Sequence, residues 1–130
     1  MPHLQFEINR DIPEHEKEKF IFEVRDCFSK IMKTGTYHIA ISLKVLNNTS
    51  IFLGRVKYGK KVCLMNLDIR EGRTYKQKRM LVKEYISLVE NFFGVPSANQ
   101  YITFTEHKGE DFNLEEKSLQ DWTKDDNPLD

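Results

Sequence analysis

The stretch that decides the fold runs from residue 65 to residue 94 and reads MNLDIREGRTYKQKRMLVKEYISLVENFFG. Its first residues alternate between apolar and polar, which is the pattern of a strand with one buried face. The apolar residues that follow recur three or four positions apart, which predicts an amphipathic helix. Thr74 followed by Gln77 is typical of a capping box at a helix start, and Gly94 predicts the helix end. The stretch is therefore predicted to be a strand followed by a helix.

A similar pattern lies 61 positions earlier in the chain (65 − 4 = 61). Three strand positions and seven helix positions pair at this offset: Leu4, Phe6, Ile8, Phe20, Ile21, Val24, Cys27, Phe28, Ile31 and Met32 with Met65, Leu67, Ile69, Leu81, Val82, Tyr85, Leu88, Val89, Phe92 and Phe93. Another alternating stretch follows each helix, at residues 38–42 and 101–105, with an offset of 63 (102 − 39 = 63). A strand-helix-strand unit is thus predicted to be duplicated, with pseudo-repeats at about 2–47 and 61–107.

Each predicted unit needs a right-handed crossover, which gives two parallel strands with a helix over one face. Two units related by a pseudo-two-fold axis form an α+β fold: a four-stranded mixed sheet with both helices on one face. We expect one domain over residues 1–130, with a polar tail at about 123–130. An extra strand at Ile51 to Leu53 and a short helix at Leu114 to Trp122 are also predicted.

The sheet face away from the helices is predicted to carry mixed and mostly small side chains, such as Ala40, Ser42 and Thr103. Parallel strands are usually covered on both faces. Another subunit is therefore expected to pack on this face, and a face exposed to solvent is the alternative.

Charge and composition exclude several classes of partner. The 20 Lys and Arg balance 20 Asp and Glu, so the formal net charge is zero and we expect neither a nucleic-acid nor a membrane partner. Apolar runs are too short for a transmembrane span. Cys27 and Cys63 stand in no metal-binding or redox motif, so both are interpreted as reduced core residues of a cytoplasmic protein. The four histidines form no HxH or HExxH motif, and no metal site is expected.

The start of the chain offers a candidate base. Initiator Met is commonly removed before a small residue, and its loss here would leave Pro2 with a free secondary amine just before the first strand. An α-amino group titrates at about 7.7 to 8.0 in a simple peptide, and desolvation or a nearby cation lowers this value. Pro2 can therefore act as a neutral base near pH 7, and an ordinary chain start is the alternative interpretation.

A candidate anion site lies in the turn between the third strand and its helix, which contains Arg70 and Arg73. The carboxyl ends of parallel strands, helix N-termini and paired guanidinium groups all favour anions. Two solvated surface arginines are the alternative. Because the third strand is predicted to run antiparallel to the first, Pro2 is expected near both arginines. His38, at the start of the second strand, reaches the same edge and is either a polar partner or a structural histidine.

With these residues, the chain resembles the tautomerase superfamily, whose members have a catalytic amino-terminal proline and a duplicated or dimerised βαβ architecture. The stretches Phe52-Leu53-Gly54-Arg55 and Leu67-Asp68-Ile69-Arg70-Glu71-Gly72-Arg73 are similar to the cis-3-chloroacrylic acid dehalogenase group. The resemblance covers the chain from Pro2 to about Glu116.

The resemblance implies a homotrimer, no cofactor and small unsaturated or 2-oxo carboxylate substrates. It makes Pro2 the catalytic amine, and Arg70 and Arg73 the residues that bind and polarise the substrate carboxylate. The group's water-activating glutamate falls near Glu116, beside Glu115.

Two positions depart from that group. Its active-site histidine on the first helix falls at about Ser29 or Lys30, and its tyrosine on the last strand falls near Thr105. Neither the histidine nor the tyrosine is present here, and this argues against efficient hydrolytic dehalogenation.

These observations lead to three functional hypotheses. In the first, neutral Pro2 catalyses keto-enol tautomerisation while Arg70 and Arg73 hold the carboxylate. In the second, protonated Pro2 acts as an acid while Glu116 activates water, which is hydration or dehalogenation of an unsaturated acid. An amine pKa of about 6 to 7 favours the base, and one above about 8 favours the acid. The third is a non-catalytic trimeric binding protein with the same fold.

Overall fold

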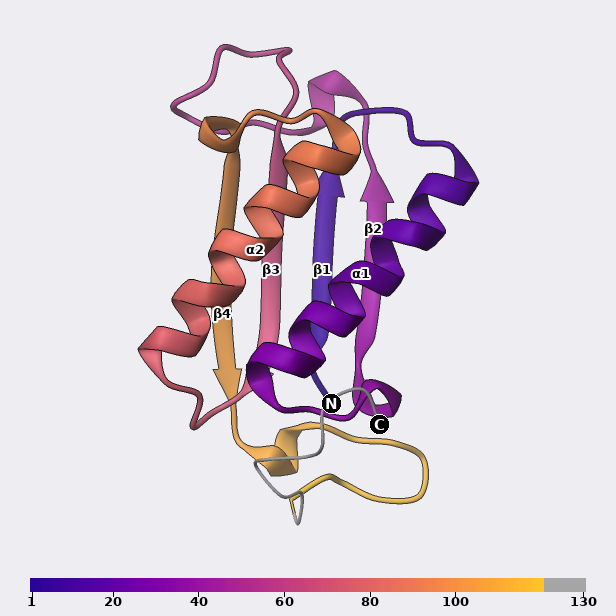
Figure 1. Ribbon diagram of the computed structural model, residues 1–130, viewed down its shortest axis with the longest axis vertical. Helices are drawn as coiled ribbons and strands as arrows, with labels where there is room; N and C mark the ends of the chain where they lie inside the picture. The colour runs from indigo at the N-terminus through magenta and orange to yellow at the C-terminus, as the bar shows by residue number, and fades with distance from the viewer. Residues whose placement is uncertain (121–130) are drawn as a thin grey trace.

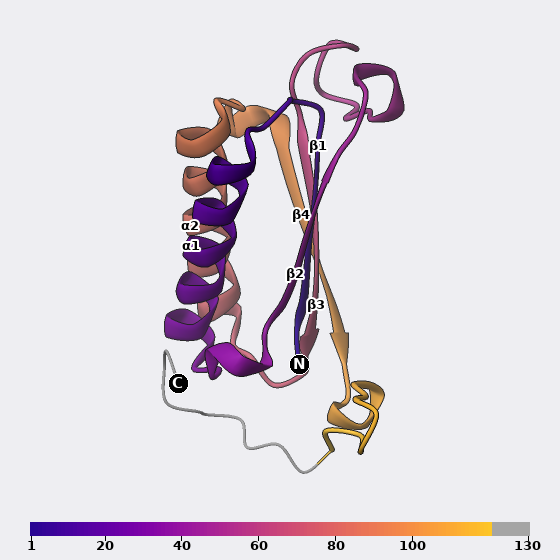
Figure 2. The same cartoon turned by 90° about the vertical axis from the view of Figure 1, so that its right-hand side faces the viewer.

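The computed structural model describes residues 1–120. Its helices and strands are β1 (His3–Ile8), α1 (Glu14–Met32), β2 (Ala40–Val45), β3 (Cys63–Arg70), α2 (Tyr75–Phe93) and β4 (Gln100–His107). Short 3-10 helices follow four of these elements: η1 (Thr36–His38), η2 (Asn48–Ser50), η3 (Ser97–Asn99) and η4 (Gly109–Asp111). Both α-helices lie on one side of the sheet (Figures 1 and 2). The predicted α+β fold with two βαβ units is confirmed.

The strand order in the sheet is β2-β1-β3-β4. Each βαβ unit contributes one parallel pair, β1 with β2 and β3 with β4. The two units join through β1 and β3, which are antiparallel with His3 opposite Asp68. This register brings the start of β1 beside the end of β3, so the predicted neighbourhood of Pro2 and the arginine turn follows from the topology.

An aromatic cluster forms the centre of the core between the sheet and the helices. The Phe20 ring of α1 meets the Phe6 ring of β1 edge-on at 5.2 Å between centroids and lies 4.6 Å from the Phe93 ring of α2. Tyr85 of α2 is fully buried, and its hydroxyl donates to the Val24 carbonyl at 3.0 Å. Phe20 of α1 therefore packs against both the sheet and α2.

The helix predicted from Thr74 begins and ends as the sequence indicates. The Thr74 hydroxyl accepts from the Gln77 backbone N–H at 3.1 Å, and the Gln77 side chain accepts from the Thr74 backbone N–H at 2.9 Å. Gly94 ends the helix with a left-handed φ of 69°. This conformation has little steric cost for glycine, since it has no Cβ.

The extra strand predicted at Ile51 to Leu53 is wrong. These residues are irregular and follow η2 in the loop between β2 and β3, which extends beyond the end of the sheet (Figure 2). Ile51 is buried, while Phe52 is exposed and packs against the Tyr58 ring. An apolar triplet forms a strand only where a neighbouring backbone pairs with it, and residues 51–53 form no such pairing within the described part of the chain.

The helix predicted from Leu114 is also wrong over residues 114–120, and Trp122 and the tail lie outside the described residues. The chain after η4 instead turns back on itself, with an antiparallel bridge between Asn113 and Ser118. The Leu119 N–H donates to the Phe112 carbonyl at 2.9 Å, and the Leu119 side chain is buried. Burial of one leucine and the pairing of backbone groups outweighed the local preference for helix.

The sheet face opposite the helices carries a groove of about 460 Å³ among the residues described. Its lining combines polar residues such as His3, Gln5 and Asn66 with apolar residues such as Leu64 and Tyr101. The expectation that another subunit packs on this face stays a prediction. No helix within residues 1–120 is long and apolar enough to cross a membrane.

Candidate functional site

The structure brings four of the predicted site residues to one edge of the sheet: Pro2, His38, Arg70 and Arg73. Pro2 is buried, and its carbonyl accepts from the Ala40 N–H of β2 at 2.9 Å. Since His3 lies opposite Asp68, Pro2 lies at the end of β3 near Arg70. His38 ends η1, two residues before Ala40, and therefore reaches the same edge.

Arg70 is the last residue of β3, and its side chain lies on the sheet face away from the helices. The alternating burial of β3 gives it the partly exposed face. Its guanidinium lies against Gly109, and its Nη2 donates to the Gln120 carbonyl at 3.4 Å. A cavity of about 420 Å³ lies here, lined by Arg70, Glu71, Gly72 and Gly109. Arg70 thus supplies a cation to a cavity at the carboxyl ends of β3 and β4, where parallel strands commonly bind ligands.

Arg73 reaches the opposite side of the same edge. Its Nη2 donates to the Thr34 hydroxyl at 3.0 Å, and Thr34 is only 3% exposed at the end of α1. Gly72, with φ of 106°, makes the turn between the two arginines. Arg70 and Arg73 therefore bracket the end of the sheet, one from the outer face and one from the helix layer.

Glu116 is exposed and lies in the turn between the bridge residues Asn113 and Ser118. It belongs to the same segment as Gln120, whose carbonyl contacts Arg70.

The two positions at which the dehalogenase group has its histidine and tyrosine differ here in their surroundings. Ser29 is fully buried in α1, and the Thr105 hydroxyl donates to the Asn66 side-chain oxygen at 3.1 Å.

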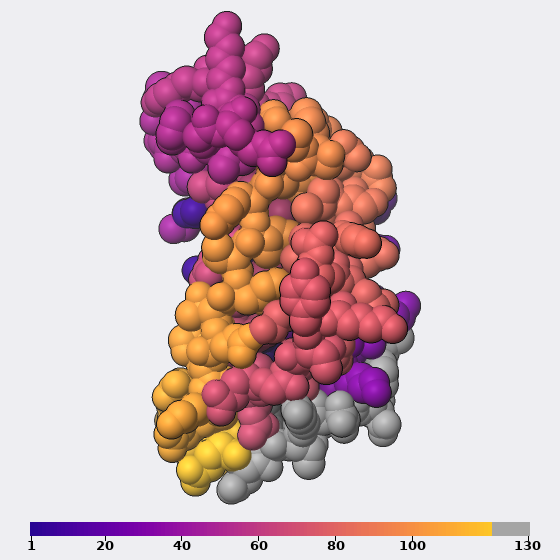
Figure 3. All heavy atoms as spheres, turned by 90° about the vertical axis from the view of Figure 1, so that its left-hand side faces the viewer, coloured from indigo at the N-terminus to yellow at the C-terminus, as the bar shows by residue number. Residues whose placement is uncertain are grey.

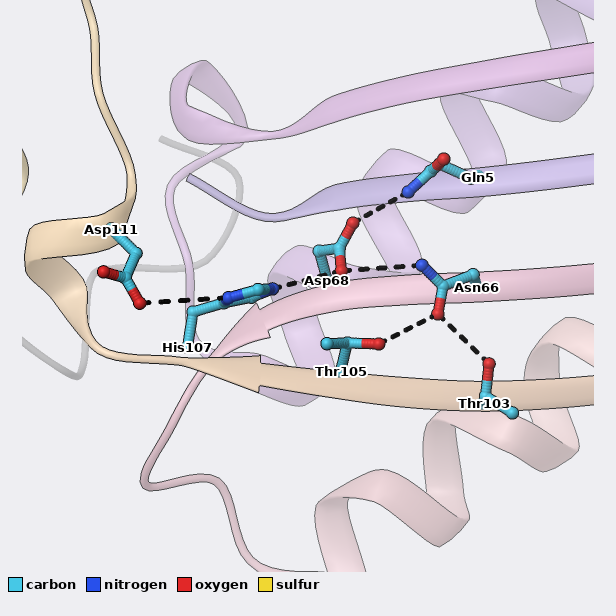
Figure 4. A network of polar contacts seen from close by, with 7 residues as sticks. All are labelled: Gln5, Asn66, Asp68, Thr103, Thr105, His107 and Asp111. Atoms are coloured by element: carbon cyan, nitrogen blue, oxygen red, sulfur yellow. Dashed lines mark hydrogen bonds and ion pairs between the residues drawn. The ribbon is translucent and has the colours of Figure 1, made fainter.

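The sequence analysis missed a polar cluster beside Arg70 on the outer face (Figure 4). Asp68 accepts from Gln5 Nε2 at 2.8 Å through one carboxylate oxygen, and His107 Nε2 lies 3.2 Å from the other. His107 Nδ1 lies 3.9 Å from an oxygen of Asp111. The register pairs His107 with Arg70. The alternation along β3, which places Asp68 and Arg70 on one face, was the available signal; the pairing with His107 needed the sheet.

The internal repeat also relates two cavities at opposite ends of the molecule. The second cavity, of about 510 Å³, lies at the carboxyl ends of β1 and β2, beside the loop that follows β2. In Figure 3 this loop lies at one end of the molecule, and the residues after β4 lie at the other. Four of its lining residues match the four of the first cavity at offsets of 61 and 63: Asn9, Arg10, Asp11 and Leu46 with Arg70, Glu71, Gly72 and Gly109.

The equivalent positions at that second edge carry different chemistry. Cys63 stands where Pro2 stands (63 − 2 = 61), and Ile12 stands where Arg73 stands (73 − 12 = 61). Asn9, the counterpart of Arg70, is buried and binds the backbone before β3, because it donates to the Lys60 carbonyl at 2.9 Å. Pro2 and the arginine pair therefore come together at only one of the two edges described.

Cys63 is expected to be inert toward alkylation at pH 8 in the folded protein. Burial raises the pKa of its thiol to about 12, with a smaller contribution from the negative charge of Glu7. Iodoacetamide reacts with the thiolate, which is then a small fraction of the folded protein. Mass spectrometry of tryptic peptides should show Cys63 modified quickly only after unfolding in denaturant. Stoichiometric labelling of native Cys63 within the time that labels the unfolded chain would contradict this prediction.

Metal ligation has no candidate in the described part of the chain, since residues 1–120 contain no group of three or more His, Cys, Asp or Glu that could hold an ion.

The sequence matches no protein-family model and no curated protein. Solved structures are similar in fold. N1, a member of the cis-3-chloroacrylic acid dehalogenase family, has a TM-score of 0.75 at 21% identity over 90% of this chain and 82% of that chain. A wild-type fused 4-OT solved as a symmetric trimer has a TM-score of 0.81 at 14% identity over 91% and 95%. The macrophage migration inhibitory factor-like protein of Entamoeba histolytica has a TM-score of 0.75 at 20% identity over 90% and 97%.

Proposed function

We propose that this chain, whose fold is that of the tautomerase superfamily, is a cofactor-independent enzyme that interconverts keto and enol forms of a small 2-oxo carboxylate. The observation that carries the proposal is the meeting of Pro2 with the arginine turn at one edge of the sheet, while the equivalent edge has neither. A site with a basic amine and two guanidinium groups suits a substrate that carries both an acidic C–H and a carboxylate.

Pro2 is the proposed base. After removal of Met1, its ring nitrogen lies at the start of β1, and the bond from the Ala40 N–H to the Pro2 carbonyl holds the residue in the sheet. The neutral amine takes a proton from the carbon next to the 2-oxo carbonyl and returns it to the carbonyl oxygen, which becomes the enol hydroxyl. The reverse reaction, ketonisation, moves the same proton from the hydroxyl to carbon.

Arg70 and Arg73 are the proposed carboxylate and enolate partners. Since they bracket the end of the sheet, a ligand held by both lies across that end, beside Pro2. Guanidinium groups bind carboxylates through paired charge-assisted hydrogen bonds. They also stabilise the negative charge that develops on oxygen as the proton leaves. His38 is proposed as a further polar group at this edge.

The protein is proposed to act as a homotrimer. The fused 4-OT of similar fold is a symmetric trimer, and the sheet face opposite the helices here carries a groove that a second copy can cover. Light scattering tests this part separately, because a stable 15 kDa monomer at micromolar concentration would contradict it.

Hydration or dehalogenation of an unsaturated acid is the second candidate. It is favoured by one observation: the segment that carries Glu116 also contacts Arg70 through the Gln120 carbonyl. In this reaction Pro2 is protonated and gives a proton to carbon, while Glu116 takes a proton from the attacking water. The N1 protein of similar fold belongs to the cis-3-chloroacrylic acid dehalogenase family.

An ultraviolet assay for ketonisation of an enolic 2-oxo acid tests the proposal. Arg70→Ala should lower kcat/KM by about 10- to 100-fold, the loss expected for hydrogen bonds to a charged group. Arg79→Ala is the matched control, because it removes the same charge from an exposed position of α2 and should leave the rate unchanged. Equal rates for wild type and Arg70→Ala would contradict a role for this arginine, and absence of turnover in wild type would contradict tautomerisation.

A further inference from the structure

The segment that follows β4 contacts the side chain of Arg70 and holds it in place. The Arg70 Nη2 donates to the Gln120 carbonyl, and the guanidinium lies against Gly109, the first residue of η4. The Glu71 N–H donates to the His107 carbonyl at 2.8 Å, which continues the β3–β4 pairing past Arg70. The segment after β4 therefore contacts, through Gly109 and Gln120, the arginine that the proposed function uses to hold the carboxylate.

Gly109 leaves room for the guanidinium. It is buried, and a Cβ built on it would lie 3.0 Å from Arg70 Nε and 3.1 Å from Cζ and Nη2. These separations are shorter than ordinary van der Waals contacts, so any larger residue displaces the guanidinium by a few tenths of an ångström. The backbone of Gly109 has no positive φ. The requirement for glycine at this position therefore comes from Arg70 and not from the turn.

His107 links the segment after β4 to the sheet. It lies opposite Arg70 in the register and places Nε2 against Asp68 and Nδ1 toward Asp111, the last residue of η4 (Figure 4). Its ring also meets Phe112 edge-on at 5.5 Å. One side chain thus links β3, β4 and the 3-10 turn that begins with Gly109.

We propose that Gly109 and His107 are positioning residues for Arg70: Gly109 sets where the guanidinium lies, and His107 holds the turn that carries Gly109. The expected effect on substrate binding rests on the proposed function, whereas the effect on the position of Arg70 does not. Neither residue touches the substrate. A displaced guanidinium makes a poorer bond to the carboxylate, and misplacement of about 1 Å can cost about 10²-fold. A shift of a few tenths should cost about tenfold, mainly in KM, because the bonds from Arg70 to the carboxylate form in the bound substrate as well as in the transition state.

Two pairs of variants test the inference. Gly109→Ala should raise KM about tenfold with kcat changed less than about threefold. Gly54→Ala is the matched control, because a Cβ at Gly54 meets nothing within 4 Å and should change neither constant. His107→Ala should raise KM likewise, and His107→Gln should restore it, since the glutamine amide can still donate to Asp68.

A second readout does not depend on turnover. In ¹⁵N NMR spectra, the Nε–H resonance of Arg70, assigned by its loss in Arg70→Lys, should move in Gly109→Ala and stay in place in Gly54→Ala. The inference is overturned if this resonance and KM are the same in the two glycine variants, or if His107→Gln is no better than His107→Ala. Should Gly109→Ala fail to fold, the His107 pair decides by the same measurements.

The two readouts also separate this inference from the proposed function. If wild type shows no turnover, the proposed function fails, and the Arg70 resonance alone decides the inference. A shift of the Arg70 resonance in Gly109→Ala but not in Gly54→Ala then supports the positioning of Arg70 by Gly109. No shift in either variant overturns it.

Discussion

Protein that retains Met1 is expected to ketonise an enolic 2-oxo acid about 10²- to 10⁴-fold more slowly than protein that begins at Pro2. This range is the usual contribution of a positioned general base. With Met1 attached, the Pro2 nitrogen is part of an amide, and its lone pair is delocalised into the carbonyl. The nitrogen then has no basicity near neutral pH, although the arginine turn is unchanged.

The comparison can be made on one preparation. Protein expressed with methionine aminopeptidase inhibited is assayed, then treated with the purified peptidase and assayed again, with intact mass reporting the loss of Met1. Activity should rise in step with the mass change. Equal activity before and after removal would contradict amine catalysis at Pro2, while leaving the contacts of Arg70 untouched.

The pH dependence of kcat/KM in the processed protein separates the two chemical roles. If Pro2 is the base, the rate rises as pH increases through the amine pKa and then levels off, because only the deprotonated amine accepts a proton. If Pro2 is the acid of a hydratase, the rate falls through the same pKa. A profile that falls with pH would therefore move the assignment to hydration, with Glu116 as the residue to test next.

Phe20→Ala is expected to lower the free energy of unfolding by about 3–5 kcal/mol, the usual cost of truncating a buried Phe. This is a large part of the ~5–15 kcal/mol that stabilises a typical domain. Phe20 is fully buried, and its ring contacts Phe6, Phe92 and Phe93. The change therefore opens a cavity at the point where α1, α2 and the sheet meet.

Phe22→Ala is the matched control on the same helix. Phe22 is 46% exposed, and its ring lies 4.8 Å from the Arg25 guanidinium, a contact worth about 0.5–1 kcal/mol at an exposed site. Urea denaturation at one protein concentration should separate the two variants by at least about 2 kcal/mol. Similar losses for both would contradict the central place of Phe20 in the core.

The elements with a strong periodic pattern could be predicted from sequence. The helix after Thr74 has both a capping box and a stop at Gly94, and its apolar stripe packs as expected. The errors fall where the pattern is short. Ile51 to Leu53 are apolar but have no strand beside them, and the segment from Leu114 bends back to bury Leu119. In both places distant backbone and side chains decide the conformation, and a local pattern does not contain them.

The site divides in the same way. Pro2 and the arginine turn could be placed at one edge from sequence, because topology alone brings the start of β1 to the end of β3. The sequence could not predict that Arg70 reaches that edge from the sheet face away from the helices and Arg73 from the helix side. These two directions depend on Thr34 after α1 and on Gly109 after β4, which are far away in the chain.

The amino-acid sequence by itself determined a duplicated βαβ unit with a proline before its first strand and two arginines after its third, because periodicity and repeat offset are properties of one dimension. Only the three-dimensional structure shows that the equivalent edge has a cavity with a different lining, and that Asp68, His107 and Gly109 lie beside Arg70. The reason is physical. Side-chain contacts across a sheet depend on register and on loop packing, and both are set by the free energy of the whole chain.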